Sequence, residues 1–262
     1  MIKWEFIDSG FQTGKYNMDF DLELVERCKA VNTSFLRFYR WKPFAISLGY
    51  NQNKTFNDYN INFEKCREDG IDIVRRPTGG RAVLHSEELT YSVILKTSMS
   101  AKELYLQISS ALINGLKMID GSNDDLQKLS LTKENPDLFK LMKTGMYNFC
   151  FNSSVKYEIN LNGKKLVGSA QRKFGDVFLQ HGSILIGNHH KNIVNYLNIG
   201  DKNSIKKLRE ELDYKTICLN DILKREVTYS EVADSLLRGF ETAMKISFQY
   251  YQPSNQYRQF NR

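Results

Sequence analysis

A glycine loop flanked by arginines is the segment whose residue types have the clearest chemical potential. Residues 75–85 read Arg-Arg-Pro-Thr-Gly-Gly-Arg-Ala-Val-Leu-His. Adjacent glycines let backbone N–H groups approach a ligand closely, and arginine binds phosphate or carboxylate through charge-assisted hydrogen bonds. The spacing matches neither a P-loop nor a dinucleotide-binding fingerprint. The segment indicates either an anion-binding loop or a tight turn with a solvated basic face. His85 at its end is either a structural or a catalytic histidine.

A hairpin follows later in the chain. Asn162-Gly163 is the residue pair preferred in two-residue hairpin turns, so Ser154–Leu161 is predicted to pair with Lys164–Arg172. The next predicted strand, Val177–Ile186, is interrupted by Gln180-His181-Gly182-Ser183. Polar residues and a glycine inside an otherwise apolar strand are typical of a strand that lines a pocket.

The lysine-bearing strand of this hairpin has polar residues at alternate positions. Lys165, Ser169 and Gln171 share one face of an ideal strand and are predicted to form a polar wall. Gly168 within the strand indicates close approach by a ligand or by another backbone. The alternative is a sheet with one wet face.

The four cysteines, Cys28, Cys66, Cys150 and Cys218, have wide and irregular spacings. This pattern argues against a zinc site, any other metal site or a disulfide framework, and favours free thiols in a reducing cytoplasm. Cys150 lies between two phenylalanines and is either a buried small hydrophobe or a nucleophile.

The elements that must position these residues mix strands and helices, and several strands follow one another directly. This order predicts an α+β fold in which a mixed or antiparallel sheet is flanked by helices. Helices are predicted at Asn17–Ala30 with Asn17 as the cap, from Ser100 to Met118 with a Ser100–Glu103 capping box, at Ser204–Leu212, and at Ser230–Met244 with Ser230 as the cap.

No linker divides the chain, so a single domain over residues 1–262 is expected, with a flexible tail at 253–262. The polar stretch 121–146 is expected to be a long loop.

Composition excludes several classes of protein. The 262 residues are 41% apolar and 26% charged, which is ordinary globular usage. No apolar run approaches the roughly 20 residues of a membrane span, and no secretory signal is evident, so a cytoplasmic protein without a membrane partner is expected. The net charge of +7 favours an acidic partner or serves solubility alone. No nucleic-acid-binding motif is evident.

Three segments together resemble the biotin/lipoate protein ligase and octanoyltransferase superfamily. They are residues 75–85, Lys165-Leu166-Val167-Gly168-Ser169-Ala170-Gln171 and Gln180-His181-Gly182-Ser183-Ile184-Leu185. The chain is most similar to the LipM-type octanoyltransferases, which place a catalytic cysteine just before the lysine hairpin, where Cys150 stands here. The resemblance implies a catalytic domain related to biotin ligases.

The resemblance also implies an activity. An octanoyl group would pass from acyl carrier protein to a lysine of a lipoyl domain, in E2 subunits or the glycine cleavage H protein, with no cofactor. Cys150 would be the nucleophile, Lys165 would favour the thiolate or act as a base, and His85 would orient a partner or shuttle protons. The residues expected to bind substrate are Arg75, Arg76, Gly79, Gly80, Arg81, Gly168, Ser169, Gln171, His181 and Gly182. Val74, Val83 and Leu84 are candidates for the lining of the acyl slot.

Hairpin geometry sets a condition on this mechanism. Continued straight, the hairpin places Cys150 opposite Gly175, ten residues from Lys165. At about 3.3 Å per residue the separation is about 33 Å. Residues 145–153 must therefore leave the sheet and fold back over the pocket.

Three other functions fit parts of the pattern. An ATP-dependent lipoate–protein ligase, using ATP and Mg, would employ the same loop and lysine, with Cys150 incidental. A transferase moving octanoate between lipoyl domains would form the same acyl-enzyme. A non-catalytic ligand- or nucleic-acid-binding protein would use the basic charge alone.

Overall fold

The computed structural model describes residues 3–52, 60–132 and 158–250. Cys150, the first part of the predicted hairpin and the predicted tail at 253–262 lie outside the described residues.

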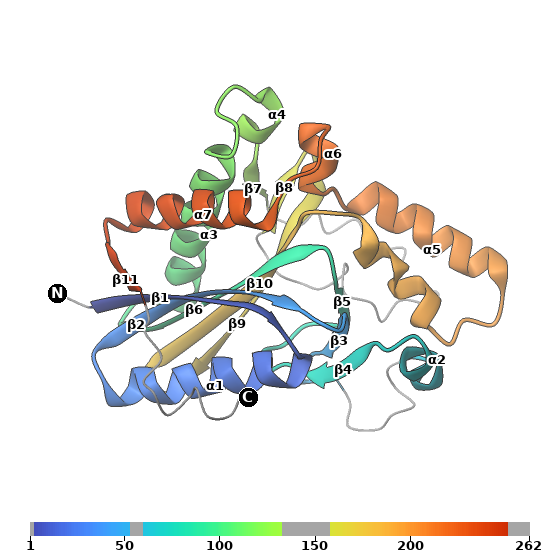
Figure 1. The fold of residues 1–262 in the computed structure, drawn as a ribbon, viewed down its shortest axis with the longest axis horizontal. Helices are drawn as coiled ribbons and strands as arrows, with labels where there is room; N and C mark the ends of the chain where they lie inside the picture. The colour runs from blue at the N-terminus through green and yellow to red at the C-terminus, as the bar shows by residue number, and fades with distance from the viewer. Residues whose placement is uncertain (1–2, 53–59, 133–157, 251–262) are drawn as a thin grey trace.

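A mixed sheet is the centre of the structure (Figure 1). Within the described residues it has eight strands in the order β11-β1-β2-β6-β10-β9-β8-β7. The strands are β1 (Lys3–Gln12), β2 (Thr33–Trp41), β6 (Glu88–Lys96), β7 (Ser130–Thr132), β8 (Glu158–Leu161), β9 (Lys164–Phe174), β10 (Val177–Leu185) and β11 (Phe248–Tyr250). β1 runs parallel to its neighbours β2 and β11. The other neighbouring pairs of this sheet, which are β2–β6, β6–β10, β10–β9, β9–β8 and β8–β7, are antiparallel. A smaller sheet places β3 (Ala45–Leu48) between β4 (Asp72–Arg75) and β5 (Val83–His85).

Helices cover both faces of the large sheet. α3 (Ala101–Lys117) and α7 (Tyr229–Met244) lie on one face, and α1 (Gly14–Ala30) lies on the other with the small sheet beside it (Figure 1). The remaining helices are α2 (Phe63–Glu68), α4 (Asp124–Gln127), α5 (Lys202–Lys215), α6 (Leu219–Leu223) and the 3-10 helix His189–Tyr196. The predicted α+β class with a mixed sheet is confirmed.

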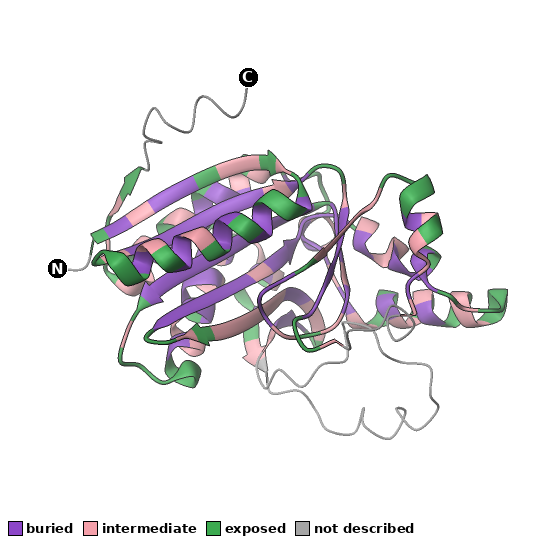
Figure 2. Ribbon diagram, turned by 90° about the horizontal axis from the view of Figure 1, so that it is seen from below, coloured by how far each residue is buried: buried purple, intermediate pink, exposed green. Residues whose placement is uncertain are grey.

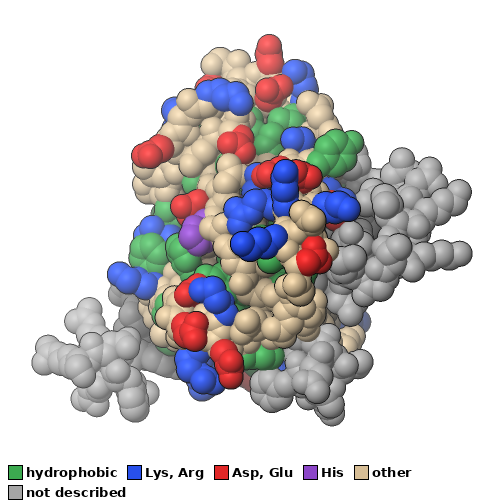
Figure 3. Space-filling view, turned by 90° about the vertical axis from the view of Figure 1, so that its right-hand side faces the viewer, with side chains coloured by type: hydrophobic (Ala, Val, Ile, Leu, Met, Phe, Trp, Pro, Cys, Tyr) green, Lys and Arg blue, Asp and Glu red, His purple; other side chains and the backbone are tan. Residues whose placement is uncertain are grey.

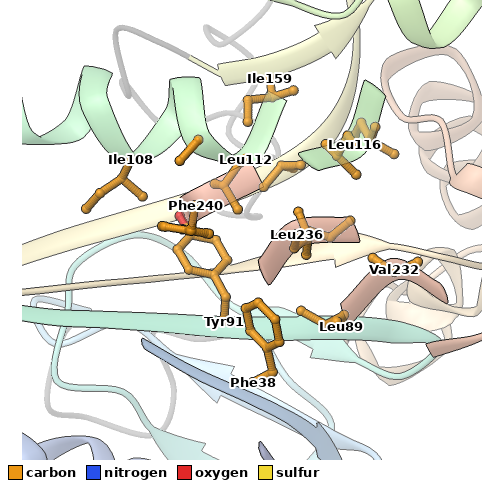
Figure 4. Packing of buried hydrophobic residues seen from close by; sticks show 14 of the residues in the cluster. Phe38, Leu89, Tyr91, Ile108, Leu112, Leu116, Ile159, Val232, Leu236 and Phe240 are labelled. Carbon is orange, nitrogen blue, oxygen red and sulfur yellow. The ribbon is translucent and has the colours of Figure 1, made fainter. Parts of the chain in front are cut away.

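The largest core lies between the sheet and the α3–α7 pair. Figure 4 shows Leu112 of α3, Leu236 and Phe240 of α7 and Tyr91 of β6 in one cluster, all fully buried. The central strands are buried on both faces, while α1 exposes its outer side (Figure 2). Among the described residues, no helix combines the length and the apolar character that crossing a bilayer requires.

Two predicted helix caps are wrong, and a third is confirmed. α1 is capped by Thr13, because Asn17 lies inside the helix and donates a buried hydrogen bond to the carbonyl of Arg40 instead. α7 is capped by Thr228 rather than Ser230. The Ser100–Glu103 capping box forms as predicted. Sequence spacing alone does not separate neighbouring residues that can all cap.

The described part of the predicted loop at 121–146, residues 121–132, contains a helix and a strand. Asn123 caps the short helix α4, and β7 adds the outermost strand to the large sheet by pairing with β8. A three-residue strand at a sheet edge depends on its partner, so a local sequence pattern does not reveal it.

Candidate active site

Two cross-strand rows of residues build the floor of a pocket on the α1 side of the large sheet. In register across β2, β6, β10 and β9, the first row is Arg37, Ser92, His181 and Ala170, and the second is Tyr39, Thr90, Ser183 and Gly168. Alternate residues of a strand face opposite sides, so the intervening row points toward α3 and α7. These rows bring polar side chains into a buried site.

The pocket has a volume of about 290 Å³. Its apolar wall is formed by Met18, Tyr39, Trp41, Val83 and Leu185. Its remaining lining residues are Ser47, Arg76, Gly79, Gly80, Arg81, His85, Thr90, Lys165, Gly168, Ser169, Ala170, Gln171, His181, Gly182, Ser183 and His190. This size lies at the small end of the range for ligand pockets and suits a short apolar chain with a polar end.

Among the described residues predicted to form the site, all but Arg75 line this pocket. Arg75 is not part of the lining, because its guanidinium donates to the carbonyls of Gly49, Tyr50 and Gln52 beside the loop. Cys150 lies outside the described residues.

Of the three residues suggested for the acyl slot, Val83 lines the pocket. Leu84 packs in the second core, and Val74 packs near Met18 and Trp41.

Arg76 organises the glycine loop. Its guanidinium donates to the carbonyls of Gly79 and Arg81 and to both the carbonyl and the hydroxyl of Ser47. Gly80 has a φ of +100°, and a Cβ there would lie 2.5 Å from Nη2 of Arg76. Gly80 is therefore needed for the conformation of the loop itself. A Cβ on Gly79 would meet nothing within 4 Å, so this side of the loop is open.

His85 occupies the middle of a hydrogen-bonded line. Its Nε2 lies 2.7 Å from the hydroxyl of Ser47, and its Nδ1 lies 2.8 Å from Oε1 of Glu88. The ring stacks on Trp41 with centroids 4.0 Å apart. Thr90 and Ser183 also donate to Oε1 of Glu88. Burial raises the pKa of Glu88, but the electrostatic interaction with His85 and these hydrogen bonds outweigh it, so the pKa lies below its ordinary value.

His181 belongs to a second buried network. Its Nε2 lies 2.6 Å from the hydroxyl of Thr78 in the glycine loop, and its Nδ1 lies 3.1 Å from Asp21. Asp21 also pairs with the fully buried Arg37 at 2.8 Å. Burial raises the pKa of Asp21, but Arg37 and His181 bring it below its ordinary value. Burial lowers the pKa of His181, which favours the neutral ring.

Lys165 forms an ion pair with Glu158, each side chain being 12% exposed. A Cβ on Gly168 would lie 3.0 Å from Cε of Lys165. Gly168 therefore leaves room for the lysine side chain to lie across the strand. The close approach predicted at this glycine is made by Lys165 itself.

Lys165, Ser169 and Gln171 all line the pocket, but the prediction that their side chains share one face of the strand is wrong. Lys165 pairs with Asn160, but Val167 pairs with Ile159, so a β-bulge adds Leu166 to the strand. The extra residue reverses the alternation.

The side chains beyond the bulge confirm this reversal. Ser169 hydrogen bonds to Tyr91 in the apolar core, and Gln171 donates to Gln180. A Cβ on Gly182 would clash with the carbonyl of Gly168 at 2.4 Å, so Gly182 permits close packing of β9 against β10.

The three described cysteines are poor nucleophiles. Cys28, Cys66 and Cys218 are buried, and burial raises the pKa of each thiol to about 11. A thiol with so high a pKa is protonated at neutral pH and unreactive. The structure thus agrees with a structural role for all three. Within the described ranges, no group of histidine, cysteine and acidic residues is arranged to hold a metal ion.

Sequence reasoning missed several polar residues at the site, among them Ser47, Glu88 and Glu158. Ser47 stands inside the apolar strand Ala45–Leu48, whereas Glu88 begins β6 directly after Ser86 and Glu87. A polar residue within an apolar run was the available signal for Ser47, and Glu88 had no such signal. Glu158 gave none, because its pairing with Lys165 depends on the register of the bulged hairpin.

Comparison with known proteins agrees with this geometry. The lipoyl protein ligase A/B catalytic domain family matches residues 13–241. The chain belongs to this family. Octanoyltransferase LipM of Lysinibacillus sphaericus is 32% identical over 252 residues, which cover 94% of this chain and 88% of that protein. Octanoyltransferase LipM of Bacillus subtilis is 31% identical over 259 residues, covering 97% and 90%.

Solved structures of the lipoyl protein ligase A/B family share the fold. A bipartite lipoate protein ligase from Thermoplasma acidophilum superposes with a TM-score of 0.73 at 19% identity, covering 99% of this chain and 90% of that one. A lipoate-protein ligase A bound with ATP gives 0.72 at 19%, covering 98% and 91%. The resemblance inferred from the three sequence segments is confirmed.

Proposed function

We propose that this protein is an octanoyltransferase of lipoate biosynthesis. It would move an octanoyl group from acyl carrier protein, through a thioester on Cys150, to a lysine of a lipoyl domain. The observation that carries this proposal is the similarity to LipM octanoyltransferases at 32% identity over 94% of the chain. A lipoyl domain as acceptor is supported by the fold shared with the Thermoplasma acidophilum ligase, whose structure was described with its E2 lipoyl domain.

The pocket suits this substrate. Met18, Tyr39, Trp41, Val83 and Leu185 offer an apolar wall in a volume of about 290 Å³. Each methylene buried there contributes about 0.8 kcal/mol to binding. The polar lining includes Lys165, residues of the glycine loop and His85, which supports a role for these hydrogen-bonding groups around a reacting carbonyl.

The chemistry proceeds in two acyl transfers. The thiolate of Cys150 attacks the thioester carbonyl, a new C–S bond forms, and the carrier's thiol leaves. The acceptor amine then attacks the acyl-enzyme, the amide C–N bond forms, and the Cys150 sulfur departs as a thiolate. Such transfer from a thioester needs neither ATP nor another cofactor.

Lys165 is positioned to stabilise negative charge in this reaction. Its ammonium is held by the Glu158 carboxylate and lies over Gly168 at the pocket. A fixed cation beside a thiol favours the thiolate. The proposal requires the segment bearing Cys150 to return to Lys165 over the pocket.

Charge on the surface fits acidic carrier partners. The net charge is +7, and α5 carries Lys202, Lys206, Lys207, Arg209 and Lys215. Figure 3 views the side on which α5 lies in Figure 1 and shows lysine and arginine gathered there, interspersed with acidic side chains. Such a surface raises the association rate with acidic proteins more than their affinity.

Mass spectrometry tests the proposal directly. Protein mixed with octanoyl-acyl carrier protein is expected to gain one octanoyl group, located on the peptide containing Cys150. Cys150→Ala abolishes this adduct and the transfer to a lipoyl domain, whereas Cys66→Ala serves as the matched control and retains both. An unchanged transfer rate in Cys150→Ala rejects the mechanism. ATP-dependent attachment of free lipoate that persists in Cys150→Ser establishes a ligase instead.

A further inference from the structure

Ser47, His85 and Glu88 form a line of hydrogen bonds that begins at the pocket wall. Ser47 Oγ lies 2.7 Å from Nε2 of His85, and Nδ1 of His85 lies 2.8 Å from Oε1 of Glu88. Ser47 and His85 both line the pocket, and Glu88 is buried behind them. A hydroxyl, an imidazole and an orienting carboxylate in this order are the geometry of a general-base unit.

The groups around Ser47, His85 and Glu88 determine which atom of each hydrogen bond donates the proton. Glu88 has its pKa lowered despite burial, so its carboxylate accepts the Nδ1–H of His85. Nε2 then carries the lone pair that faces Ser47. Arg76 donates to Ser47 Oγ at 3.1 Å, which directs the serine O–H toward His85. A proton arriving at Ser47 can therefore pass inward to the imidazole.

Glu88 has the charge to stabilise a protonated His85. Its Oε1 accepts hydrogen bonds from His85, Thr90 and Ser183, whereas the buried Oε2 has no hydrogen-bond partner among the described residues. A carboxylate with one oxygen unsatisfied retains much of its negative charge in a low-dielectric surrounding. A merely structural network would be expected to satisfy both oxygens.

Lys165 is less suited to be the base. Its ammonium is paired with Glu158, and an ammonium group has three N–H donors and no lone pair to accept a proton. The pocket thus has a fixed cation, Lys165, on β9 and a candidate proton acceptor, His85, on β5.

We propose that Ser47, His85 and Glu88 relay the proton released when the acceptor amine attacks the acyl-enzyme. This inference rests on the proposed octanoyl transfer. As the C–N bond forms and the thioester C–S bond breaks, the amine proton moves to Ser47 Oγ while the serine proton moves to His85 Nε2. The Cys150 sulfur leaves as a thiolate, and His85 later releases its proton to solvent.

The charged and titratable groups around His85 come from every neighbouring element. They are Glu88 on β6, Arg76 in the glycine loop, His181 on β10 with Asp21 of α1 behind it, His190 on the 3-10 helix, and Lys165 across the pocket. Burial lowers the pKa of His181 and lowers that of His190 to about 4, so neither ring takes up a proton near neutral pH.

Single-turnover kinetics on the acyl-enzyme test the relay. The full chain is first octanoylated with octanoyl-acyl carrier protein, then mixed with a lipoyl domain, quenched, and followed by mass spectrometry from pH 5.5 to 8.5. The parent is expected to transfer more slowly as the pH falls. Once acylated, His85→Gln and Ser47→Ala are expected to transfer about 10²–10⁴-fold more slowly than the parent at pH 8.5, and this difference is expected to narrow as the pH falls.

Controls separate the relay from folding. His189→Gln changes a histidine outside the pocket and retains the parental rate and pH dependence. Ser47→Thr restores the hydroxyl and recovers transfer. Because only acylated molecules are followed, a misfolded fraction does not enter the rate.

The outcomes are distinct. A parent that forms no thioester on Cys150 overturns the proposed function and the relay for that step. A parent that acylates, with His85→Gln transferring at the parental rate and pH dependence, overturns the relay alone. Slowing of His85→Gln by the same factor at every pH shows a structural role, and an octanoyl ester on Ser47 shows a nucleophile; each also overturns the relay.

Discussion

The two faces of the large sheet are built from the same strands and are equally buried, yet they differ in chemistry. On β6 the residues facing α3 and α7 are Leu89, Tyr91, Val93 and Leu95, and those facing α1 and the pocket are Glu88, Thr90, Ser92 and Ile94. Every one of these side chains is buried.

The difference separates what stabilises the fold from what positions the site. The face under α3 and α7 gains stability from non-directional burial of apolar area. The pocket face depends on directional partners, such as Arg37 with Asp21 and His85 with Glu88. Such partners hold side chains in one geometry but are costly when one of them is lost.

The largest effect is expected from breaking the buried ion pair of the pocket face. Arg37→Met leaves Asp21 as an uncompensated buried charge and should lower the free energy of unfolding by about 3–5 kcal/mol, measured by urea denaturation. Adding Asp21→Leu should recover most of this loss. A cost below about 1 kcal/mol for the single variant would contradict the comparison.

A cavity on the apolar face should cost a similar or smaller amount. Leu112→Ala is expected to destabilise by about 2–5 kcal/mol, since the side chain is fully buried against α7. Leu22→Ala, at an exposed position of α1, is the matched control and should change stability by about 0.5 kcal/mol or less. Unlike Arg37→Met, the Leu112 variant should show the same loss across pH; a loss that varies with pH would argue against a purely apolar face.

The loss of folding stability in acid should arise from residues on the pocket face of the sheet. Burial lowers the pKa of His190 from 6.5 to about 4. The unfolded chain then binds a proton that the folded protein rejects, so about 3 kcal/mol of stability is present above pH 6.5 and is lost as the pH falls toward 4. The difference in unfolding free energy between the parent and His190→Gln should shrink over this window. A difference that stays constant with pH would show that the ring does not resist protonation.

The smallest effect tests the packing of the helix pair. A Cβ on Gly239 would lie 2.4 Å from Cα of Gly115, so Gly239→Ala should force α3 and α7 apart and cost about 1–3 kcal/mol. Gly121→Ala, where a Cβ would meet nothing within 4 Å, is the control. Equal thermal unfolding of the two variants would show that this crossing tolerates added volume.

Features that depend on neighbouring residues could be predicted from the sequence. The Asn162-Gly163 turn has φ values of +50° and +80°, as this residue pair favours, and the Ser100–Glu103 capping box forms. The glycine loop and Lys165 were found because their residue types are unusual in apolar surroundings, and both line the pocket.

What tertiary structure alone decided is which partner each buried polar group meets. The bulge at Leu166 arises because Leu166 and Val167 both pack into the core, and it turned Ser169 and Gln171 away from Lys165. The contact between Ser47 and His85 joins strands 38 residues apart. Local backbone conformation depends on residues that are adjacent in the sequence. These contacts depend instead on how helices and strands from distant parts of the chain pack together. The sequence by itself therefore determined the fold class and the reactive residue types, and packing determined their geometry.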